Sequence, residues 1–351
     1  MGKKFCLSTK TPAAEAPAFN ALESYAAVVE SFNALNDSIE SLSAVEAEAI
    51  QIETIRDSAR EAMEAFQACG VTADMLGIYN RGGRLDAELG LEALDVSKAT
   101  AEMLEARKQE YVSKLGESVA SCEGAIVEWF KKFLNAILDF FKKFFHMDAQ
   151  IIKTLDGLKE TIEKPSNPDA TMKGLSQKSL KTVCAALKGI DALCNELKTK
   201  ISGDGADPDE IDSLITKKIN PSITAMGLTW ENGKISGDFK DEFKESEGTV
   251  KDKGFTGGAK AELAQVKGYL DSSGIKALSK QLVDITKKCA AAAKDGDEAA
   301  TRTRDVVIKA NAFIKFHAKL TRMAAITLLS LGRTGGVAKK EEKPAEGAEK
   351  K

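Results

Sequence analysis

The sequence lacks the residues from which most active sites and metal centres are built. It contains two histidines, His146 and His317, and six cysteines without a single Cys-x-x-Cys pair. Zinc sites need closely spaced pairs of Cys or His ligands, so this spacing cannot assemble one. The HExxH, GxSxG and GxxxxGK[ST] motifs are also missing. We therefore expect a protein that is not an enzyme and binds no metal or cofactor.

One glycine-rich segment weakly resembles a phosphate-binding loop. Residues 254–260 read GFTGGAK. A phosphate-binding loop of the common type follows a strand and ends in Gly-Lys-Ser or Gly-Lys-Thr, because the backbone amides and the lysine together hold the phosphates. This segment has neither feature, so we expect no nucleotide site there.

Proline and strand-like alternation are scarce as well. The chain has seven prolines in 351 residues, and Ala, Leu, Lys and Glu are abundant. This composition is typical of helices. No uncharged apolar run reaches the 18 residues that a membrane-spanning helix needs, and residues 1–19 lack the apolar core of a secretory signal. We predict an all-α protein, an elongated bundle of antiparallel helices without strands.

Apolar residues at intervals of three and four place the helices. Thr72, Ser97 and Asp207 are the expected N-caps, and Pro221 is expected to end one helix. Residues 231–258 are polar and rich in glycine, which predicts a long exposed loop or hinge with room for a short helix at 239–243. Residues 1–17 read as a flexible arm and 333–351 as a disordered tail. The main helices are predicted at about 19–42, 50–66, 97–114, 118–146 (with an apolar pattern that extends toward 162), 172–200, 208–220, 259–293 (interrupted at 272–274) and 298–331.

The aromatic residues gather in one helix. Residues 126–146 hold six of the fifteen phenylalanines and one of the two tryptophans. At 100° per residue they form one apolar face, with lysine pairs at 131–132 and 142–143 beside it. Such a face can pack in a core or against a partner, lie in a membrane interface, or drive self-assembly. The residues of this face include Trp129, Phe130, Phe133, Leu134, Ile137, Phe141, Phe144 and Phe145.

Charge divides the chain into two parts. Residues 1–123 carry 11 Lys and Arg against 21 Asp and Glu, whereas the remainder carries 39 against 32. We therefore predict an acidic helical region at 1–123, a basic helical region at 124–332 that opens with the aromatic helix, and the tail at 333–351.

The last predicted helix is basic. Its lysines and arginines form either a solvated face or a set of nonspecific phosphate contacts to DNA. Nothing indicates sequence-specific recognition. The candidate contacts are Arg302, Arg304, Lys309, Lys315, Lys319 and Arg322.

Glutamates two residues after a small residue are concentrated in the acidic part. Eight of the sixteen Glu in residues 1–123 fit this pattern, against two of the fifteen after residue 123. An acidic leader of this kind (ALESYAAVVESFNALNDSIESLSAVEAEA), followed by a Trp/Phe/Lys helix (EWFKKFLNAILDFFKKFF), resembles the internal head (inner capsid) proteins of large tailed bacteriophages.

The resemblance implies a processed virion protein. In that family a prohead protease cleaves after Glu and removes an acidic propeptide, and the mature part is packaged with the genome. Carried onto this chain, the scissile residues would be Glu40, Glu46, Glu64 or Glu123. The implied location is the virion interior, after synthesis in the host cytoplasm, with capsid or other internal head proteins as partners. The alternative from another class is a membrane-active or lipid-binding helical bundle, such as an α-type pore former, that uses helix 126–146.

Overall fold

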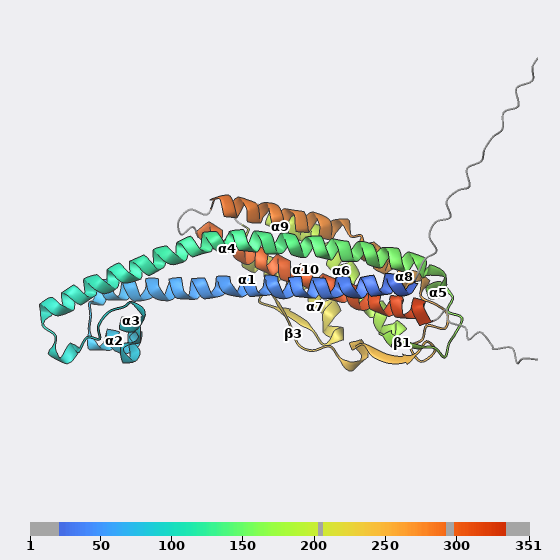
Figure 1. Ribbon diagram of the computed structural model, residues 1–351, viewed down its shortest axis with the longest axis horizontal. Coiled ribbons are helices and arrows are strands. Elements are labelled where there is room, and N and C mark those ends of the chain that lie inside the picture. The colour runs from blue at the N-terminus through green and yellow to red at the C-terminus, as the bar shows by residue number, and fades with distance from the viewer. Residues whose placement is uncertain (1–20, 203–205, 293–297, 335–351) are drawn as a thin grey trace, which may run out of the picture.

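The chain forms a long helical hairpin that carries a body of shorter helices along one part of its length (Figure 1). The computed structural model describes residues 21–202, 206–292 and 298–334. Helix α1 (Ala21–Cys69) runs to the distal tip of the hairpin, and α4 (Ala101–Gly157) returns antiparallel to it. The predicted fold class is confirmed, because the described chain is mostly helical and built from long antiparallel helices. The predicted arm at 1–17 and residues 335–351 of the predicted tail lie outside the described residues, whereas Arg333 and Thr334, the first two residues of that predicted tail, belong to the last helix.

The two hairpin helices are longer than predicted. Helix α1 covers both of the helices predicted at 19–42 and 50–66, and α4 joins those predicted at 97–114 and 118–146 and continues to Gly157. The predicted break at Gly116 and the predicted start of the aromatic helix near residue 118 are therefore wrong. A glycine inside a helix costs only about 1 kcal/mol, and packing between two long helices outweighs that cost.

A small separate core closes the tip of the hairpin. Phe66 stacks on Tyr111 with ring centroids 4.5 Å apart, and the Tyr111 hydroxyl donates a 2.6 Å hydrogen bond to the buried carboxylate of Asp86. The N-cap predicted at Thr72 is confirmed, but Thr100 rather than Ser97 caps α4. The short elements here are α2 (Ala73–Tyr79), η1 (Arg81–Gly83), α3 (Arg84–Glu88) and η2 (Val96–Lys98).

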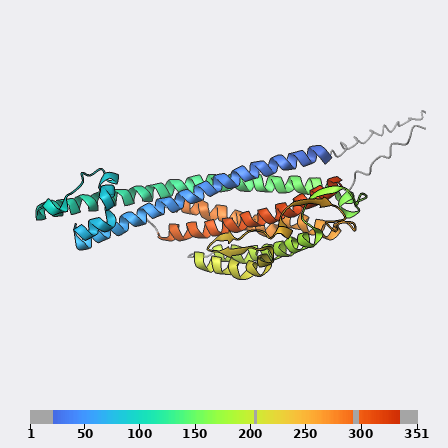
Figure 2. The same cartoon turned by 90° about the horizontal axis from the view of Figure 1, so that it is seen from below.

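In the body, α10 lies between the hairpin and the helices α6 and α7 (Figure 2), whereas α9 packs directly against α4 (Figure 1). Asp207 caps α7 directly before Pro208, as predicted, whereas Pro221 stays inside that helix and does not end it. The interruption predicted near residue 272 separates α8 from α9. The helices of the body are α5 (Lys159–Glu163), α6 (Gln177–Ile201), α7 (Pro208–Ile223), η3 (Thr224–Met226), α8 (Lys260–Leu270), α9 (Ser273–Ala292) and α10 (Glu298–Thr334).

Short strands correct the expectation of an exposed loop at 231–258, whereas a 3-10 turn lies within the short helix predicted at 239–243. Strands β1 (Thr171–Gly174) and β4 (Ser246–Thr249) pair antiparallel, as do β2 (Thr229–Glu231) and β3 (Lys234–Ser236). The turn η4 (Asp241–Phe243) lies between them. The segment is held in place because Phe243, Val250 and Phe255 insert into the main core with at most 3% of their surface exposed.

Helix α10 buries a histidine that makes stability depend on pH. His317 is 1% exposed, and neither ring nitrogen has a hydrogen-bond partner among the described residues. Burial lowers the pKa of His317 from 6.5 to about 4. Between these values the unfolded chain binds a proton that the folded chain does not, so the free energy of unfolding falls as the pH falls.

We expect the His317→Leu variant to lose this dependence. Over the range from pH 7 to pH 4 the wild type should lose about 3 kcal/mol more stability than the variant. Urea unfolding followed by circular dichroism at several pH values measures the difference. Parallel pH profiles for the two proteins would contradict a neutral buried His317.

Candidate functional site

The aromatic face of α4 lies in the main core. Trp129 stacks on Phe133 with ring centroids 4.9 Å apart, and its indole Nε1 donates a 2.6 Å hydrogen bond to the carbonyl oxygen of Val45 in α1. Of the face predicted from sequence, Trp129, Phe130, Phe133, Ile137, Phe141 and Phe144 are at most 5% exposed, and Leu134 and Phe145 pack partly buried against the same core.

Polar contacts between α1 and α4 border this aromatic interface. Lys132 pairs with Glu48 at 2.6 Å, and the Ser38 hydroxyl donates to Asp139 at 3.2 Å. Of the three interpretations of the aromatic helix, core packing is thus the arrangement in this structure. In the part of the chain that the structure describes, no helix combines the length and apolarity needed to cross a membrane.

The basic residues of α10 face acidic residues of α1. Lys315 Nζ contacts Glu46 at 2.7 Å, and the same carboxylate accepts a 2.7 Å hydrogen bond from Asn311. Arg304, which is 6% exposed, pairs with Glu53. Ion pairs of low exposure are screened little by salt. The acidic half of the chain therefore neutralises part of the basic half within one molecule.

The other candidate phosphate contacts are distributed along α10. Lys309 pairs with Asp209 at 3.3 Å on the side of α7. Arg302 is exposed at the beginning of the helix. Lys319 and Arg322 lie together with Lys315 at a groove described below. The structure therefore does not gather all six into one exposed surface.

The four candidate cleavage sites all lie inside helices. Glu40 and Glu64 are exposed on α1, and Glu46 is held by Lys315 and Asn311. Glu123, at the predicted boundary between the acidic and basic regions, lies within α4 with Arg60 at 3.8 Å. A protease needs an extended backbone, so cleavage at any of them requires local opening of the helix.

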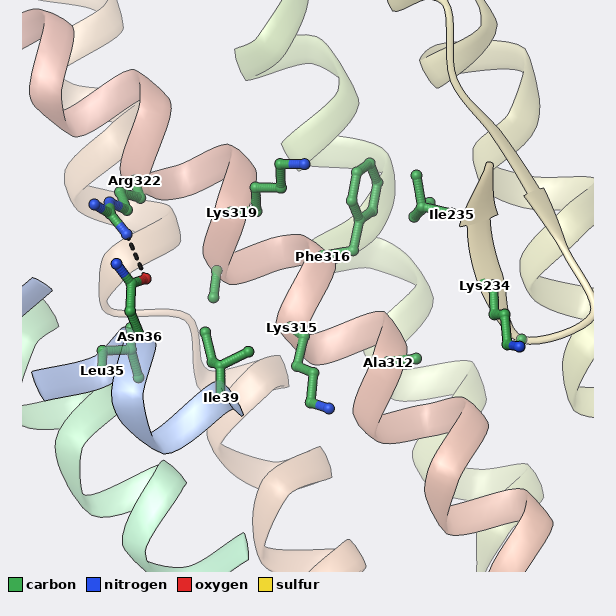
Figure 3. A pocket seen from close by; sticks show the side chains of 12 residues that line it. Leu35, Asn36, Ile39, Lys234, Ile235, Ala312, Lys315, Phe316, Lys319 and Arg322 are labelled. Carbon is green, nitrogen blue, oxygen red and sulfur yellow. Dashed lines mark hydrogen bonds between the residues drawn. The ribbon is translucent and has the colours of Figure 1, made fainter. Parts of the chain in front are cut away.

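A groove of about 490 Å³ lies between α1, α10 and the β2–β3 hairpin (Figure 3). In Figure 3, Leu35 and Ile39 approach from α1, Ile235 lies on the opposite side, and Phe316 of α10 lies between them. These side chains make the interior apolar. The lining residues are Leu35, Asn36, Ile39, Gly233, Lys234, Ile235, Ala312, Lys315, Phe316, Ala318, Lys319 and Arg322.

The groove carries four positive residues and no acidic one in its lining. Arg322 donates a 2.6 Å hydrogen bond to the neutral side chain of Asn36, and its guanidinium lies 4.4 Å from the ring centroid of Phe32. Lys319 Nζ lies 4.9 Å from the ring centroid of Phe239. Burial lowers the pKa of Arg322, an effect that the negative charge of Glu245 partly offsets.

Sequence reasoning identified the α10 side of this groove but missed the hairpin side. Lys234 and Ile235 belong to β3, in a segment predicted to be a loop. Asn232 and Gly233 have positive φ angles of 50° and 71°. An Asn-Gly pair between short apolar segments is the usual signal for a two-residue hairpin turn. The sequence TWENGKIS contains that signal.

A metal site requires several His, Cys, Asp or Glu side chains close together. Among residues 21–202, 206–292 and 298–334, no cluster of His, Cys, Asp and Glu could hold a metal ion. No protein-family model matches the chain, and no curated protein or solved structure matches it.

Proposed function

We propose that this chain is a structural internal protein of a bacteriophage head, packaged with the genome beside capsid or other internal head proteins. The observation that carries this proposal is the pairing of acidic α1 with basic α10 in one molecule, through Glu46 with Lys315 and Glu53 with Arg304. The acidic helix covers positive charge that DNA phosphates would otherwise attract. Such a cover suits a protein that must assemble before the genome enters.

Proteolytic maturation would remove part or all of the acidic helix α1 that covers the positive charge of α10. Cleavage after Glu40, Glu46 or Glu64 shortens α1, and cleavage after Glu123 separates all of α1 and the tip from the basic helices. Cleavage after Glu64 or Glu123 removes both Glu46 and Glu53, cleavage after Glu46 removes Glu46 alone, and cleavage after Glu40 removes neither. Where Glu46 is removed, Lys315 loses its carboxylate partner and becomes available to phosphates, whereas Arg304 keeps its contact with Asp305. The prohead protease is thus the partner that this proposal requires.

The intact mass of the protein from its natural source tests the maturation step. We expect a mature chain that starts directly after one of the four glutamates, and a full-length chain in immature particles. A full-length chain in mature particles would overturn the cleavage step.

Substitution of the α1 glutamates tests the charge cover in the full-length protein. The Glu46→Gln, Glu53→Gln variant should bind duplex DNA several-fold more tightly at low salt than the wild type. The slope of log affinity against log salt should steepen by about one, because Lys315 is freed whereas Arg304 keeps Asp305 as a carboxylate partner. Fluorescence anisotropy with a labelled duplex measures both quantities.

A charge-matched control separates the cover from net charge. Glu30 and Glu105 are exposed, so the Glu30→Gln, Glu105→Gln variant changes the net charge equally but frees no cation of α10. It should bind DNA much as the wild type does. Equal tightening in both double variants would contradict a specific role for Glu46 and Glu53.

The second candidate is a membrane-active bundle that uses residues 126–146. It is favoured by the Lys132–Glu48 and Ser38–Asp139 contacts, which are polar and can separate to let α1 leave the aromatic face. Wild-type protein should then float with anionic liposomes, whereas a Ser38→Cys, Asp139→Cys disulfide should prevent flotation until it is reduced. Failure of the wild type to float would remove this candidate.

A further inference from the structure

The groove between α1, α10 and the β2–β3 hairpin has an apolar floor, in which Phe316 and Leu35 are 4% and 2% exposed and Ile39 and Ile235 are partly buried. Phe316 lies on its α10 side, Leu35 and Ile39 on its α1 side, and Ile235 on its hairpin side. Ligand sites for small molecules enclose roughly 300–1,000 Å³ and are mostly apolar with a few polar groups. The groove, at about 490 Å³, falls in this range.

The cations of the groove are not equally neutralised. Lys315 is satisfied by Glu46. For Lys319, Arg322 and Lys234, the described part of the chain provides no carboxylate within ion-pair distance, although Glu245 acts on Arg322 from farther away. Arg322 is partly buried, whereas Lys319 and Lys234 are exposed to solvent. A partly buried cation without a counter-ion is unfavourable. An anionic group placed between Lys319 and Arg322, which are three residues apart on α10 and so share a face, would supply the missing charge.

The combination of floor and cations selects the class of ligand. The phosphates of a nucleic acid would pair with the cations, but they would not pack against the apolar side chains of Phe316, Leu35 and Ile39. A phospholipid brings two acyl chains, which exceed the volume of one groove of about 490 Å³. A single acyl chain with one anionic head group matches both features.

We propose that this groove binds a long-chain fatty acid, with its acyl chain against Phe316 and its carboxylate at Lys319 and Arg322. Lys234, on the exposed strand β3, contributes a second cation at the rim. Burial of the alkyl chain provides most of the affinity, and the charge-assisted hydrogen bonds fix the orientation. This binding does not depend on a role in the virion.

Displacement of a dansyl-labelled fatty acid from the full-length protein tests the site. Unlabelled myristate should displace the probe, and myristyl alcohol, which has the same chain without the charge, should do so about tenfold less well. The Lys319→Gln variant should lower the affinity for myristate about tenfold. The Ala312→Phe variant, which fills the groove, should abolish displacement.

A lysine outside the lining of the groove provides the control for this experiment. Lys188 is an exposed lysine on α6, remote in sequence from the groove, so Lys188→Gln should bind as the wild type does. Circular dichroism melting of each variant verifies folding, and Lys234→Gln replaces any variant that fails to fold. The assignment is overturned if the wild type does not bind the probe, if the alcohol competes as well as myristate, or if Ala312→Phe binds normally. Binding of anionic phospholipid vesicles without binding of myristate would also overturn it.

Discussion

Replacement of Phe133 by alanine is expected to lower the free energy of unfolding by about 3–5 kcal/mol. Phe133 is fully buried and stacks on Trp129 at the centre of the interface between α4 and α1. Truncation removes the buried ring and leaves a cavity between two rigid helices that cannot collapse. Urea unfolding monitored by far-ultraviolet circular dichroism measures the change.

Leu138 provides a matched control on the same helix. It is an apolar residue of α4 with 41% of its surface exposed, so Leu138→Ala should change the unfolding free energy by less than about 1 kcal/mol. If both variants lose similar stability, or if Phe133→Ala is neutral, the aromatic face does not pack against α1 in solution and must find another environment.

The Gly258→Ala variant is expected to lose about 4 kcal/mol of stability or to fail to fold. Gly258 has a φ angle of +76°, and a Cβ atom at this position would overlap the carbonyl oxygen of Glu163. The left-handed conformation costs a side chain roughly 1–2 kcal/mol, and moving the Glu163 backbone away from the added methyl group costs more than that. The close approach is fixed by the 2.9 Å hydrogen bond from the Ala259 amide to Ile162.

The neighbouring residue Gly257 provides a matched control for the Gly258→Ala prediction. Gly257 has an ordinary backbone conformation, and a Cβ atom there would meet nothing within 4 Å. Gly257→Ala should therefore be within about 0.5 kcal/mol of the wild type. Thermal melting of the two variants side by side distinguishes them, and equal melting temperatures would contradict the tight junction between α5 and the loop before α8. The segment 254–260, which weakly resembles a phosphate-binding loop, serves this backbone junction in the structure.

Long helices were predictable from sequence because their apolar periodicity is local. The pattern through Phe32, Leu35 and Leu42 in α1 repeats every three or four residues whatever the rest of the chain does. The predicted helix breaks within α1 and α4 were wrong because they depend on contacts that are not local. Whether Gly116 interrupts a helix depends on the partner helix packed beside it, and the sequence around Gly116 does not contain that information.

The strands were missed because their pairing is long-range. Thr171 of β1 lies opposite Thr249 of β4, across 78 positions of the chain, and each strand has only four residues, too few to show alternation. Even so, Trp230 and Phe255 stand out as large apolar residues in a polar region. Two such residues without a helical pattern indicate that a segment is anchored to a core.

The candidate site was predictable only in part. The cations of α10 were identified from composition, but the partners that distinguish Lys315, which is paired with Glu46, from Lys319 come from another helix. Charge patterns show where positive residues lie along one helix. They do not show which of these residues pair with a carboxylate from another helix. The groove is distinguished by the cations that have no such partner within the described chain.

The separate core at the tip has a consequence for the proposed proteolytic maturation. It contains few large side chains, chiefly Phe66, Tyr111 and Leu115, and shares no buried residue with the main core. Small cores open more often than large ones, so the end of the hairpin should open locally while the body stays closed. Glu64 adjoins Phe66 in α1, whereas Glu40 and Glu46 lie along the body. Glu123 also lies near the tip, four residues after Val119 of the small core. A protease that requires local opening would therefore reach Glu64 or Glu123 before Glu40 or Glu46, and the stability of the tip would set the time at which cleavage begins.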